Sequence, residues 1–388
     1  MTSSTIAVAA LGRPRVKPEH RPYRTTDGNV RIGSVVYGIG AEIEDPRGWV
    51  WSLIGAMDGS RGPAAVVAEV LARHPALVDR GDLDDEGVRQ AMADLFAAGF
   101  LEDAAAEVPL PDRERVRYSR GVPLLRWMDR GPRRSPWDAQ LRLREARVLL
   151  VGLGGTGGHA AQSLVASGVG RLHCVEPDVV ELSNLNRQPL YRESDIGRPK
   201  VTAALAALRA LNSDVTVTGE RREVRGPEDL TELVGTARDA GAPYDLLVLA
   251  ADHPVRIRRW ANRVCLAAGL PWTDAGYRGP VATAGVYRPG SGACWECLRE
   301  GEDARRDLRL PPGQDEEVAS PRMPWNPATA VTAGLSGAHL AHAALALLTG
   351  IPDVEPGFRF GVNLMVPGDP ILERFPRRPE CPACGRQP

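Results

Sequence analysis

The distribution of apolar residues divides the chain into two parts. From residue 147 onward, short apolar runs such as 148–151 and 246–249 alternate with longer segments in which apolar side chains recur every three or four positions. Short continuous runs are typical of buried parallel strands, and the longer period is typical of helices that cover a sheet. The pattern predicts an α/β fold over residues 147–388, with a Rossmann-like domain whose mixed sheet ends in a hairpin.

The first part of the chain carries shorter elements. The expected elements are strands over 30–37 and 39–44 and helices near 45–59, 63–73 and 84–98. Two strands followed by three short helices predict a small winged-helix-like α+β domain over residues 30–106. Residues 1–29 show no period and are expected to be poorly ordered. Residues 107–146 are expected to be a linker rich in Pro and Arg.

Composition limits the roles of such a protein. The chain has 388 residues, 43% of them hydrophobic, and a formal net charge of −1. It can form about two domains, but it lacks the positive charge that nucleic acid or an anionic membrane attracts. Residues 82–103 are acidic, which disfavours DNA binding by the winged-helix-like domain. We find no apolar run near the roughly 20 residues of a membrane span and no signal-peptide pattern, so we expect a cytoplasmic protein without nucleic-acid or membrane partners.

A glycine-rich turn follows the first predicted strand of the α/β domain. Residues 152–158 read Gly-Leu-Gly-Gly-Thr-Gly-Gly and precede an apolar helical run to Ala166. This order is typical of a nucleotide-binding βαβ unit, where the backbone approaches a phosphate at a helix N-terminus. The phosphate-binding residues expected from the turn are Gly152, Gly154, Gly155 and Gly157. Glu176, at the end of the next strand, is placed to bind a ribose hydroxyl.

A polar set distinguishes this unit from that of a nicotinamide-dependent enzyme. It consists of Asp178, the segment 183–188 (Ser-Asn-Leu-Asn-Arg-Gln), Lys200 and the strand-end Asp252. A nicotinamide site has no use for these side chains. In this order they resemble the ThiF/MoeB/HesA family, the adenylating relatives of ubiquitin-activating enzymes, and the resemblance covers roughly residues 115–385.

The resemblance implies that AMP is transferred from ATP to a carboxylate, which gives an acyl-adenylate and pyrophosphate. The further residues that it implies for ATP and magnesium are Ser183, Asn184, Arg187, Lys200, Asp252 and His253. In this scheme Arg187 and Lys200 bring positive charge to the phosphates, and Asp252 holds Mg²⁺. The sequence departs from the family at His253, where Asn is usual, and at Glu176, where Asp is usual.

A further arginine is implied by the same resemblance. The segment 117–120 (Arg-Tyr-Ser-Arg) is similar to the one that opens these adenylating domains, although Gly121 replaces the usual Gln. In the family this arginine reaches the ATP phosphates of the opposite subunit of a dimer. The resemblance therefore implies a homodimer in which Arg120 acts in trans, with Arg187, Lys200 and Asp252 as the other catalytic residues.

Four of the six cysteines form two Cys-x-x-Cys pairs, Cys294 with Cys297 and Cys381 with Cys384. In a reducing compartment, two such pairs are typical of one tetrahedral zinc site, and four thiolates leave no open position for a substrate. We expect a structural zinc ion; a redox pair or a chance arrangement is the alternative. No cysteine lies between Cys297 and Cys381, so we expect no enzyme thioester on the loop between them.

The N-terminal domain suggests a peptide substrate. Its order of elements and the segment 53–59 (Leu-Ile-Gly-Ala-Met-Asp-Gly) resemble the leader-peptide recognition domain of ribosomal-peptide-modifying enzymes, where the leader adds a strand to a sheet edge. A dimerisation or packing domain is the alternative. The function expected is ATP-dependent adenylation of a carboxylate on a leader-bearing precursor peptide. The alternatives are adenylation of the C-terminal Gly of a ubiquitin-like sulfur carrier, and non-catalytic leader binding beside a cyclodehydratase.

Overall fold

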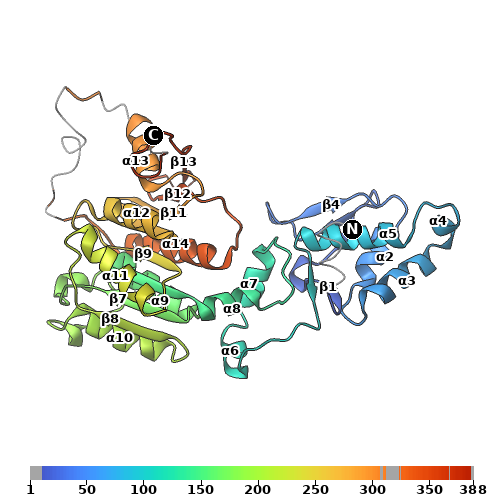
Figure 1. The fold of residues 1–388 in the computed structure, drawn as a ribbon, viewed down its shortest axis with the longest axis horizontal. Coiled ribbons are helices and arrows are strands. Elements are labelled where there is room, and N and C mark those ends of the chain that lie inside the picture. Colours follow the sequence, from blue (N-terminus) through green and yellow to red (C-terminus); the bar gives the residue numbers. More distant parts are fainter. Residues whose placement is uncertain (1–10, 306–308, 312–322, 324, 367, 386–388) are drawn as a thin grey trace. The chain divides into compact units, whose positions relative to one another are not determined.

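The computed structural model describes residues 11–305, 309–311, 323, 325–366 and 368–385 (Figure 1). The chain divides into two compact units. Residues 1–142 with 351–353 are called the N-terminal unit, and residues 143–350 with 354–388 the C-terminal unit. Helix α8 (Asp138–Glu145) runs across the boundary.

The N-terminal unit is built from short elements. In chain order they are β1 (Pro14–Val16), η1 (Pro18–His20), β2 (Tyr23–Arg24), β3 (Val30–Ile32), β4 (Ala41–Ile43), α2 (Trp49–Ala56), α3 (Pro63–Arg73), α4 (Pro75–Asp79), α5 (Asp85–Ala97), β5 (Leu101–Asp103), α6 (Asp112–Arg117) and α7 (Gly121–Met128). Strands β2, β3 and β4 form one antiparallel sheet, and β1 pairs with β5. The helices expected over 63–73 and 84–98 are confirmed, whereas the strands of the hairpin are shorter than expected.

The helices of this unit enclose one apolar core. Leu53 of α2, Val66 of α3 and Met92 of α5 are all fully buried in it. Helix α2 begins at Trp49 and not at Asp45, but the Asp45 carboxylate still accepts hydrogen bonds from the N–H groups of Val50 and Trp51, at 3.1 and 2.9 Å. These bonds satisfy donors that the first turn leaves without an intrahelical partner.

The prediction that residues 1–29 are poorly ordered is wrong for the part that the structure describes, which begins at residue 11. Strand β1 pairs with β5 in the register Pro14 to Asp103. The buried carboxylate of Asp103 also accepts the N–H groups of Gly12 and Arg13, each at 2.9 Å. This strand forms because it pairs with a segment almost ninety residues away in the sequence. The local pattern of apolar residues therefore does not predict it.

Residues 107–142 are likewise more than the linker that we expected, because they pack into the N-terminal unit. The Nζ of the buried Lys17 donates to the carbonyl of Asp129 at 2.8 Å. A ring nitrogen of His20 lies 2.9 Å from the carbonyl of Trp127, and Arg126 pairs with the buried Glu102 at 2.8 Å. Buried charges of this kind need partners, and α7 and the residues after it supply them.

The C-terminal unit alternates strands and helices. Its elements are β6 (Arg147–Val151), α9 (Gly155–Ala166), β7 (Arg171–Val175), η2 (Leu182–Asn184), η3 (Glu193–Asp195), α10 (Lys200–Leu211), β8 (Thr216–Glu220), α11 (Pro227–Asp239), β9 (Leu246–Leu249), α12 (Ile257–Ala268), β10 (Trp272–Arg278), β11 (Val281–Tyr287), α13 (Trp295–Arg305), α14 (Ala330–Thr349), β12 (Phe358–Asn363) and β13 (Pro370–Arg374). The strands expected over 148–151 and 246–249, the helix that runs to Ala166 and the closing hairpin are all present.

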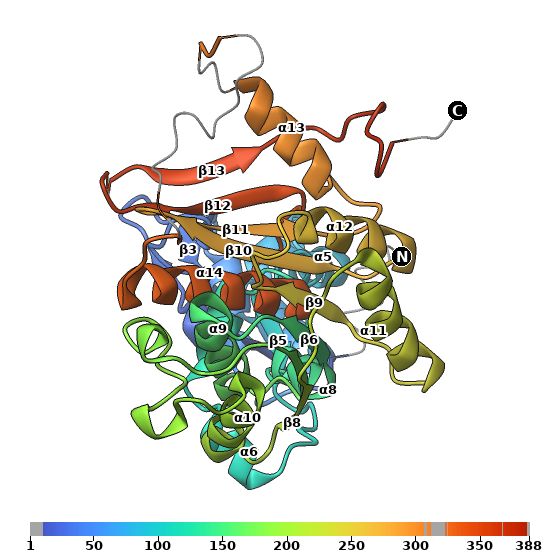
Figure 2. The same ribbon diagram turned by 90° about the vertical axis from the view of Figure 1, so that its left-hand side faces the viewer.

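Within the residues that the structure describes, eight strands form one mixed sheet in the order β13-β12-β11-β10-β9-β6-β7-β8. Strands β8, β7, β6, β9 and β10 are parallel, and β11 to β13 continue as an antiparallel meander. Helix α14 packs along α9 and against β10 and β11, while α11 and α12 lie together with α13 toward the other face (Figure 2). The predicted α/β fold with a mixed sheet is confirmed.

Helix α14 corrects one expectation from composition. It has 20 residues and a mean hydropathy of 1.4 over its most apolar window, so by length and composition alone it passes the test for a membrane span. Half of that window is buried inside the protein. Its side chains contact α9, β10 and β11, as expected for the core helix of a sheet protein.

Candidate active site

The carboxyl ends of four parallel strands lie side by side at one edge of the sheet. Strands β7, β6, β9 and β10 are adjacent and parallel in that order. Glu176, Gly152 and Asp252 follow the ends of β7, β6 and β9, and Asp274 of β10 pairs with Leu249, the last residue of β9. Because open α/β sheets bind ligands at this edge, most of the predicted site residues fall where a nucleotide would bind.

The turn between β6 and α9 is tight because its glycines have no side chain that would collide with the neighbouring backbone. Gly152 has φ of +97°, and its N–H donates to the carbonyl of Val175 at 2.9 Å. A Cβ on Gly157 would collide with the carbonyl oxygen of Gly152 and lie 3.0 Å from the Cβ of Ala250. No side chain caps α9 at Gly154. The first N–H groups of this helix therefore face the turn, which is how a backbone binds phosphate.

Glu176 joins the turn to the end of β7. The side chain is 4% exposed, and its two carboxylate oxygens accept the N–H groups of Leu153 at 2.6 Å and Asp178 at 3.0 Å. Burial raises the pKa of Glu176, and the nearby Lys200 ammonium opposes that shift. A carboxylate has about four lone-pair positions, so one on each oxygen is left for a ribose hydroxyl.

Lys200 is held at the first position of α10. Its side chain is 7% exposed, and Nζ donates to Asp178 Oδ2 at 3.0 Å. The backbone N–H of Lys200 also donates to the carbonyl of Asp178, at 2.9 Å. The ammonium has two further hydrogens. This arrangement gives a fixed positive charge beside the buried Glu176.

The segment 183–188 places a neutral donor and a cation next to the turn. Asn184 is buried, and its Oδ1 accepts the N–H of Glu181 at 3.1 Å, which leaves its amide hydrogens for another acceptor. The Nη1 of Arg187 donates to the carbonyl of Ser183 at 2.9 Å, so Ser183 contributes its backbone. Arg187 also lies over Gly155, where a Cβ would be 3.7 Å from its Cγ.

Asp252 lies on the wall of a large cavity. The cavity has a volume of about 790 Å³ and is lined by side chains that include Arg258, Asp274 and Tyr277. Burial raises the pKa of Tyr277 on the cavity wall, and the positive charge of Arg187, beside the glycine turn, opposes that shift. The turn and the cavity are therefore neighbours. The Asp252 carboxylate is 54% exposed and accepts Arg258 Nη2 at 2.8 Å. An accessible carboxylate is a suitable Mg²⁺ ligand, whereas His253 is exposed and has no role in these contacts.

Two residues of the site were not predicted. Gln188 is buried beside Gly154, and its Oε1 has no hydrogen-bond partner within the described part of the chain. The hydroxyl of the buried Tyr191 donates to the carbonyl of Leu153 at 2.8 Å and so supports the turn. An unsatisfied buried acceptor is costly, which is consistent with a ligand that donates to Gln188. Gln188 is the last residue of the segment 183–188, and Tyr191 follows it by three positions. Their closeness to that segment was the available signal.

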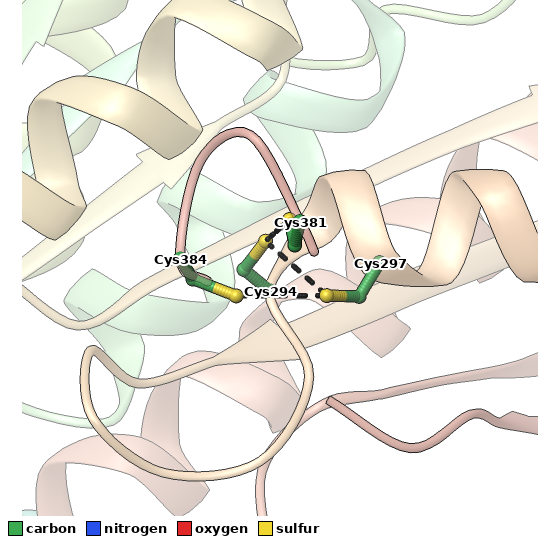
Figure 3. A group of neighbouring side chains, drawn as sticks. All are labelled: Cys294, Cys297, Cys381 and Cys384. Atoms are coloured by element: carbon green, nitrogen blue, oxygen red, sulfur yellow. Dashed lines mark hydrogen bonds between the residues drawn. The ribbon is translucent and has the colours of Figure 1, made fainter. Parts of the chain in front are cut away.

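The four predicted zinc ligands are together. The sulfur atoms of Cys294, Cys297, Cys381 and Cys384 all lie within 4.8 Å of one another (Figure 3). The separations are 3.9 Å for Cys294–Cys297, 3.7 Å for Cys294–Cys381 and 3.5 Å for Cys297–Cys384. A tetrahedral ion with Zn–S bonds of about 2.3 Å requires sulfur atoms about 3.8 Å apart. None of the four is in a disulfide. The group therefore fits zinc.

Arg120 belongs to the other unit of the chain. It is an exposed residue of the N-terminal unit, at the N-terminus of α7. Its contribution to a neighbouring subunit stays a prediction.

Comparison with known proteins identifies the family of the chain. The model of the ThiF family matches residues 119–383. The chain is 36% identical to the molybdopterin-synthase adenylyltransferase of Escherichia coli, over 50% of this chain and 73% of that protein. It is 32% identical to the pig adenylyltransferase and sulfurtransferase MOCS3, over 82% of this chain and 65% of that protein. The chain thus spans about two thirds or less of several of these relatives.

Solved structures resemble the fold of most of the chain. Escherichia coli MccB has a TM-score of 0.72 at 21% identity, with 96% of this chain and 97% of that chain covered. A structure described as MccB with AMPCPP and MccA gives 0.64, with coverage of 96% and 99%. PaaA gives 0.62 at 23% identity, with 93% of this chain and all of that chain covered. At such identities the likeness concerns the fold.

Proposed function

Since this chain belongs to the ThiF family, we propose that it is an adenylyltransferase that activates a carboxylate with ATP. The observation that supports this most directly is the continuous site formed by the glycine turn, the cations Arg187 and Lys200, and the cavity at Asp252. The relatives named adenylyltransferase support the same activity.

In the proposed reaction an oxygen of the substrate carboxylate attacks the α-phosphorus of ATP. The bond from that phosphorus to the bridging oxygen breaks, and pyrophosphate leaves. Lys200 and Arg187 would stabilise the negative charge that develops on the phosphates, and the free amide hydrogens of Asn184 would bind a phosphate oxygen. Mg²⁺, held by Asp252, supplies further charge neutralisation when it is bound. Glu176 would orient the nucleotide through its ribose.

The proposed substrate is a ribosomally made peptide that the N-terminal unit binds through a leader segment. The sheet of β2, β3 and β4 has β4 at one edge, and a peptide strand could extend it there. MccB, whose structures are described as containing MccA peptide, shares the fold over 96% of this chain. We propose a cytoplasmic homodimer with Arg120 acting in trans, as the family resemblance implies.

A sulfur-carrier protein is the second candidate substrate. The specific observation in its favour is that the chain is 37% identical over 163 residues to a protein named sulfur carrier protein ThiS adenylyltransferase, from Bacillus subtilis. Non-catalytic leader binding is less well supported, because Arg187, Lys200 and Asp252 are all retained around the cavity and the turn.

The test is ATP–pyrophosphate exchange by the full-length chain. The two probes are a precursor peptide encoded beside the gene and a β-grasp protein that ends in Gly-Gly. Exchange with the first alone supports the peptide proposal, and exchange with the second alone supports the sulfur-carrier alternative. Tight peptide binding without exchange would instead establish a binding module.

Asp252→Asn separates the two activities of the chain. The variant keeps the size of the side chain and removes its negative charge, so we expect loss of exchange with unchanged peptide affinity in a fluorescence-anisotropy titration. Simultaneous loss of both would contradict the assignment of peptide binding to the N-terminal unit.

A further inference from the structure

A row of charged side chains crosses the sheet on the side of the cavity. Asp274 of β10 pairs with Gly285 of β11, Gly285 with Arg359 of β12, and Arg359 with Glu373 of β13. Directly paired residues point to the same face of a sheet. Three of the four carry a charge, and the fourth lacks a side chain. The floor of the cavity is therefore ionic, which is unusual for a sheet interior.

Gly285 is needed for this row. A Cβ at that position would lie 2.5 Å from Asp274 Oδ1 and would collide with the hydroxyl of Tyr287. Its absence lets the Tyr287 hydroxyl donate to Asp274 at 3.1 Å, while Arg359 Nη2 lies 3.8 Å from the same carboxylate. Asp274 is thus 3% exposed yet fully partnered, and it forms a fixed anchor.

Arg258 of α12 connects this anchor to Asp252. Its Nε donates to Asp274 Oδ2 at 2.9 Å, and its Nη2 donates to Asp252 Oδ1 at 2.8 Å. The two carboxylates differ, because the Asp274 side chain is 4% exposed and that of Asp252 is 54% exposed. The Nε end is therefore fixed by a buried carboxylate. The Nη2 end of Arg258, whose side chain is 21% exposed, is held by the exposed Asp252 carboxylate and by a longer bond of 3.4 Å to the Ala275 carbonyl. An ion pair with an exposed partner contributes about 0.2–1 kcal/mol.

The exchangeable end of Arg258 lies inside the cavity. A Cβ on Gly276 would be 3.1 Å from Arg258 Nη2 and 3.8 Å from Asp252 Oδ1, so the pair rests directly above a residue without a side chain. Arg258, Asp252 and Gly276 all line the same 790 Å³ space. A carboxylate that entered this space would meet the Nη2 group next to the metal-binding position.

We propose that Arg258 is a shared clamp that binds Asp252 in the nucleotide-free protein and the substrate carboxylate once Asp252 has turned to Mg²⁺. This inference rests on the proposed adenylation. Arg258 Nη2 bonds to Oδ1 of Asp252, and a divalent cation on either oxygen of this carboxylate would neutralise part of its charge and weaken its pair with the guanidinium. Metal binding would thereby release the Nη2 hydrogen that faces Asp252, and this hydrogen would then be available to an oxygen atom of the acyl group. The clamp makes the nucleotide with its metal bind before the carboxylate.

The competition between the metal ion and Arg258 for Asp252 is tested with Mn²⁺ and α,β-methylene-ATP. This test does not require that the substrate be known. We expect Arg258→Gln to raise Mn²⁺ affinity about two- to fivefold, measured by electron paramagnetic resonance, because it removes the competing cation. Arg258→Lys keeps the charge and should show a smaller rise. Arg259→Gln is the matched control, since Arg259 is the next residue of α12 and its Nε faces Glu296 at 3.9 Å.

The acyl half is tested with 5′-O-(N-glycylsulfamoyl)adenosine, a stable mimic of an acyl-adenylate, against AMP as the control ligand. Loss of a charge-assisted hydrogen bond should weaken binding of the mimic by Arg258→Gln about tenfold or more and leave AMP binding unchanged. Equal weakening of both ligands, or no change in either the Mn²⁺ or the mimic titration, would overturn the clamp. If the wild type bound neither Mn²⁺ with the ATP analogue nor the mimic, the proposed function itself would fail, and the clamp with it.

Discussion

Two neighbouring glycines of α9 provide a test of the nucleotide turn in which one variant is the control for the other. Gly157 and Gly158 are both buried. A Cβ on Gly157 would collide with the carbonyl oxygen of Gly152 and lie 2.8 Å from its carbonyl carbon. A Cβ on Gly158 would meet its nearest neighbour, the Cβ of Leu190, at 3.5 Å, which is an ordinary contact.

The two substitutions are expected to change the free energy of unfolding in opposite directions. Replacing a helical Gly by Ala stabilises by about 0.5–1 kcal/mol when the site has room. Gly158→Ala should therefore raise the free energy of unfolding by up to that amount. Each kcal/mol corresponds to a rise in Tm of about 2–4 °C for a unit of this size. At Gly157 the collision is with backbone, which no rotamer change can relieve, and overpacking costs about 1–3 kcal/mol or more. Gly157→Ala should therefore lose stability and displace the turn.

Thermal unfolding and a calorimetric titration with α,β-methylene-ATP measure both effects on the full chain. We expect Gly158→Ala to bind the analogue like the wild type and Gly157→Ala to bind at least tenfold more weakly. A Gly157→Ala protein with wild-type Tm and wild-type affinity would refute the assignment of this turn as the phosphate site.

Two further predictions concern other parts of the chain. Burial lowers the pKa of His20 from its ordinary 6.5 to about 4. Between these two pH values the unfolded state binds a proton that the folded state does not. The free energy of unfolding should therefore decrease by up to about 3 kcal/mol as the pH is lowered from 6.5 to 4. Urea unfolding at pH 7 and pH 4.5 should show that His20→Gln reduces this difference, and an identical difference in both proteins would contradict it. Elemental analysis should find one zinc ion per chain. Cys381→Ser or a strong chelator should remove this ion and lower the Tm of the C-terminal unit. A wild-type protein that contains no metal and keeps its Tm in the presence of the chelator would exclude the site.

The parts of the structure that the sequence predicts are those with local causes. The glycine turn at 152–158 and the helix after it follow from neighbouring residues, because only glycine permits that backbone and that close approach. The Cys-x-x-Cys pairs are also local, and each pair can be recognised without knowing the fold. The polar segment 183–188 belongs to the same class.

What escaped prediction depends on residues far apart in the chain. Strand β1 exists because it pairs with β5, and α7 is held by Lys17 and His20 of the segment that we expected to be poorly ordered. The charged row at Asp274 and Arg359 requires the register of three strand pairs, and an error of one residue would turn each side chain to the opposite face. A period within one segment carries no information about such registers.

The four-cysteine cluster connects the C-terminal segment of the chain to a helix that forms part of the cavity wall. Cys297 lies on α13, the same helix that brings Arg299 and Glu302 to the wall of the cavity, and its partner sulfur at 3.5 Å comes from Cys384. During synthesis the wall helix has emerged from the ribosome about eighty residues before that partner. A nascent chain would therefore present the cavity with its wall helix unattached until residue 384 is outside the ribosome, and a zinc ion bound by the four thiolates would then complete the attachment.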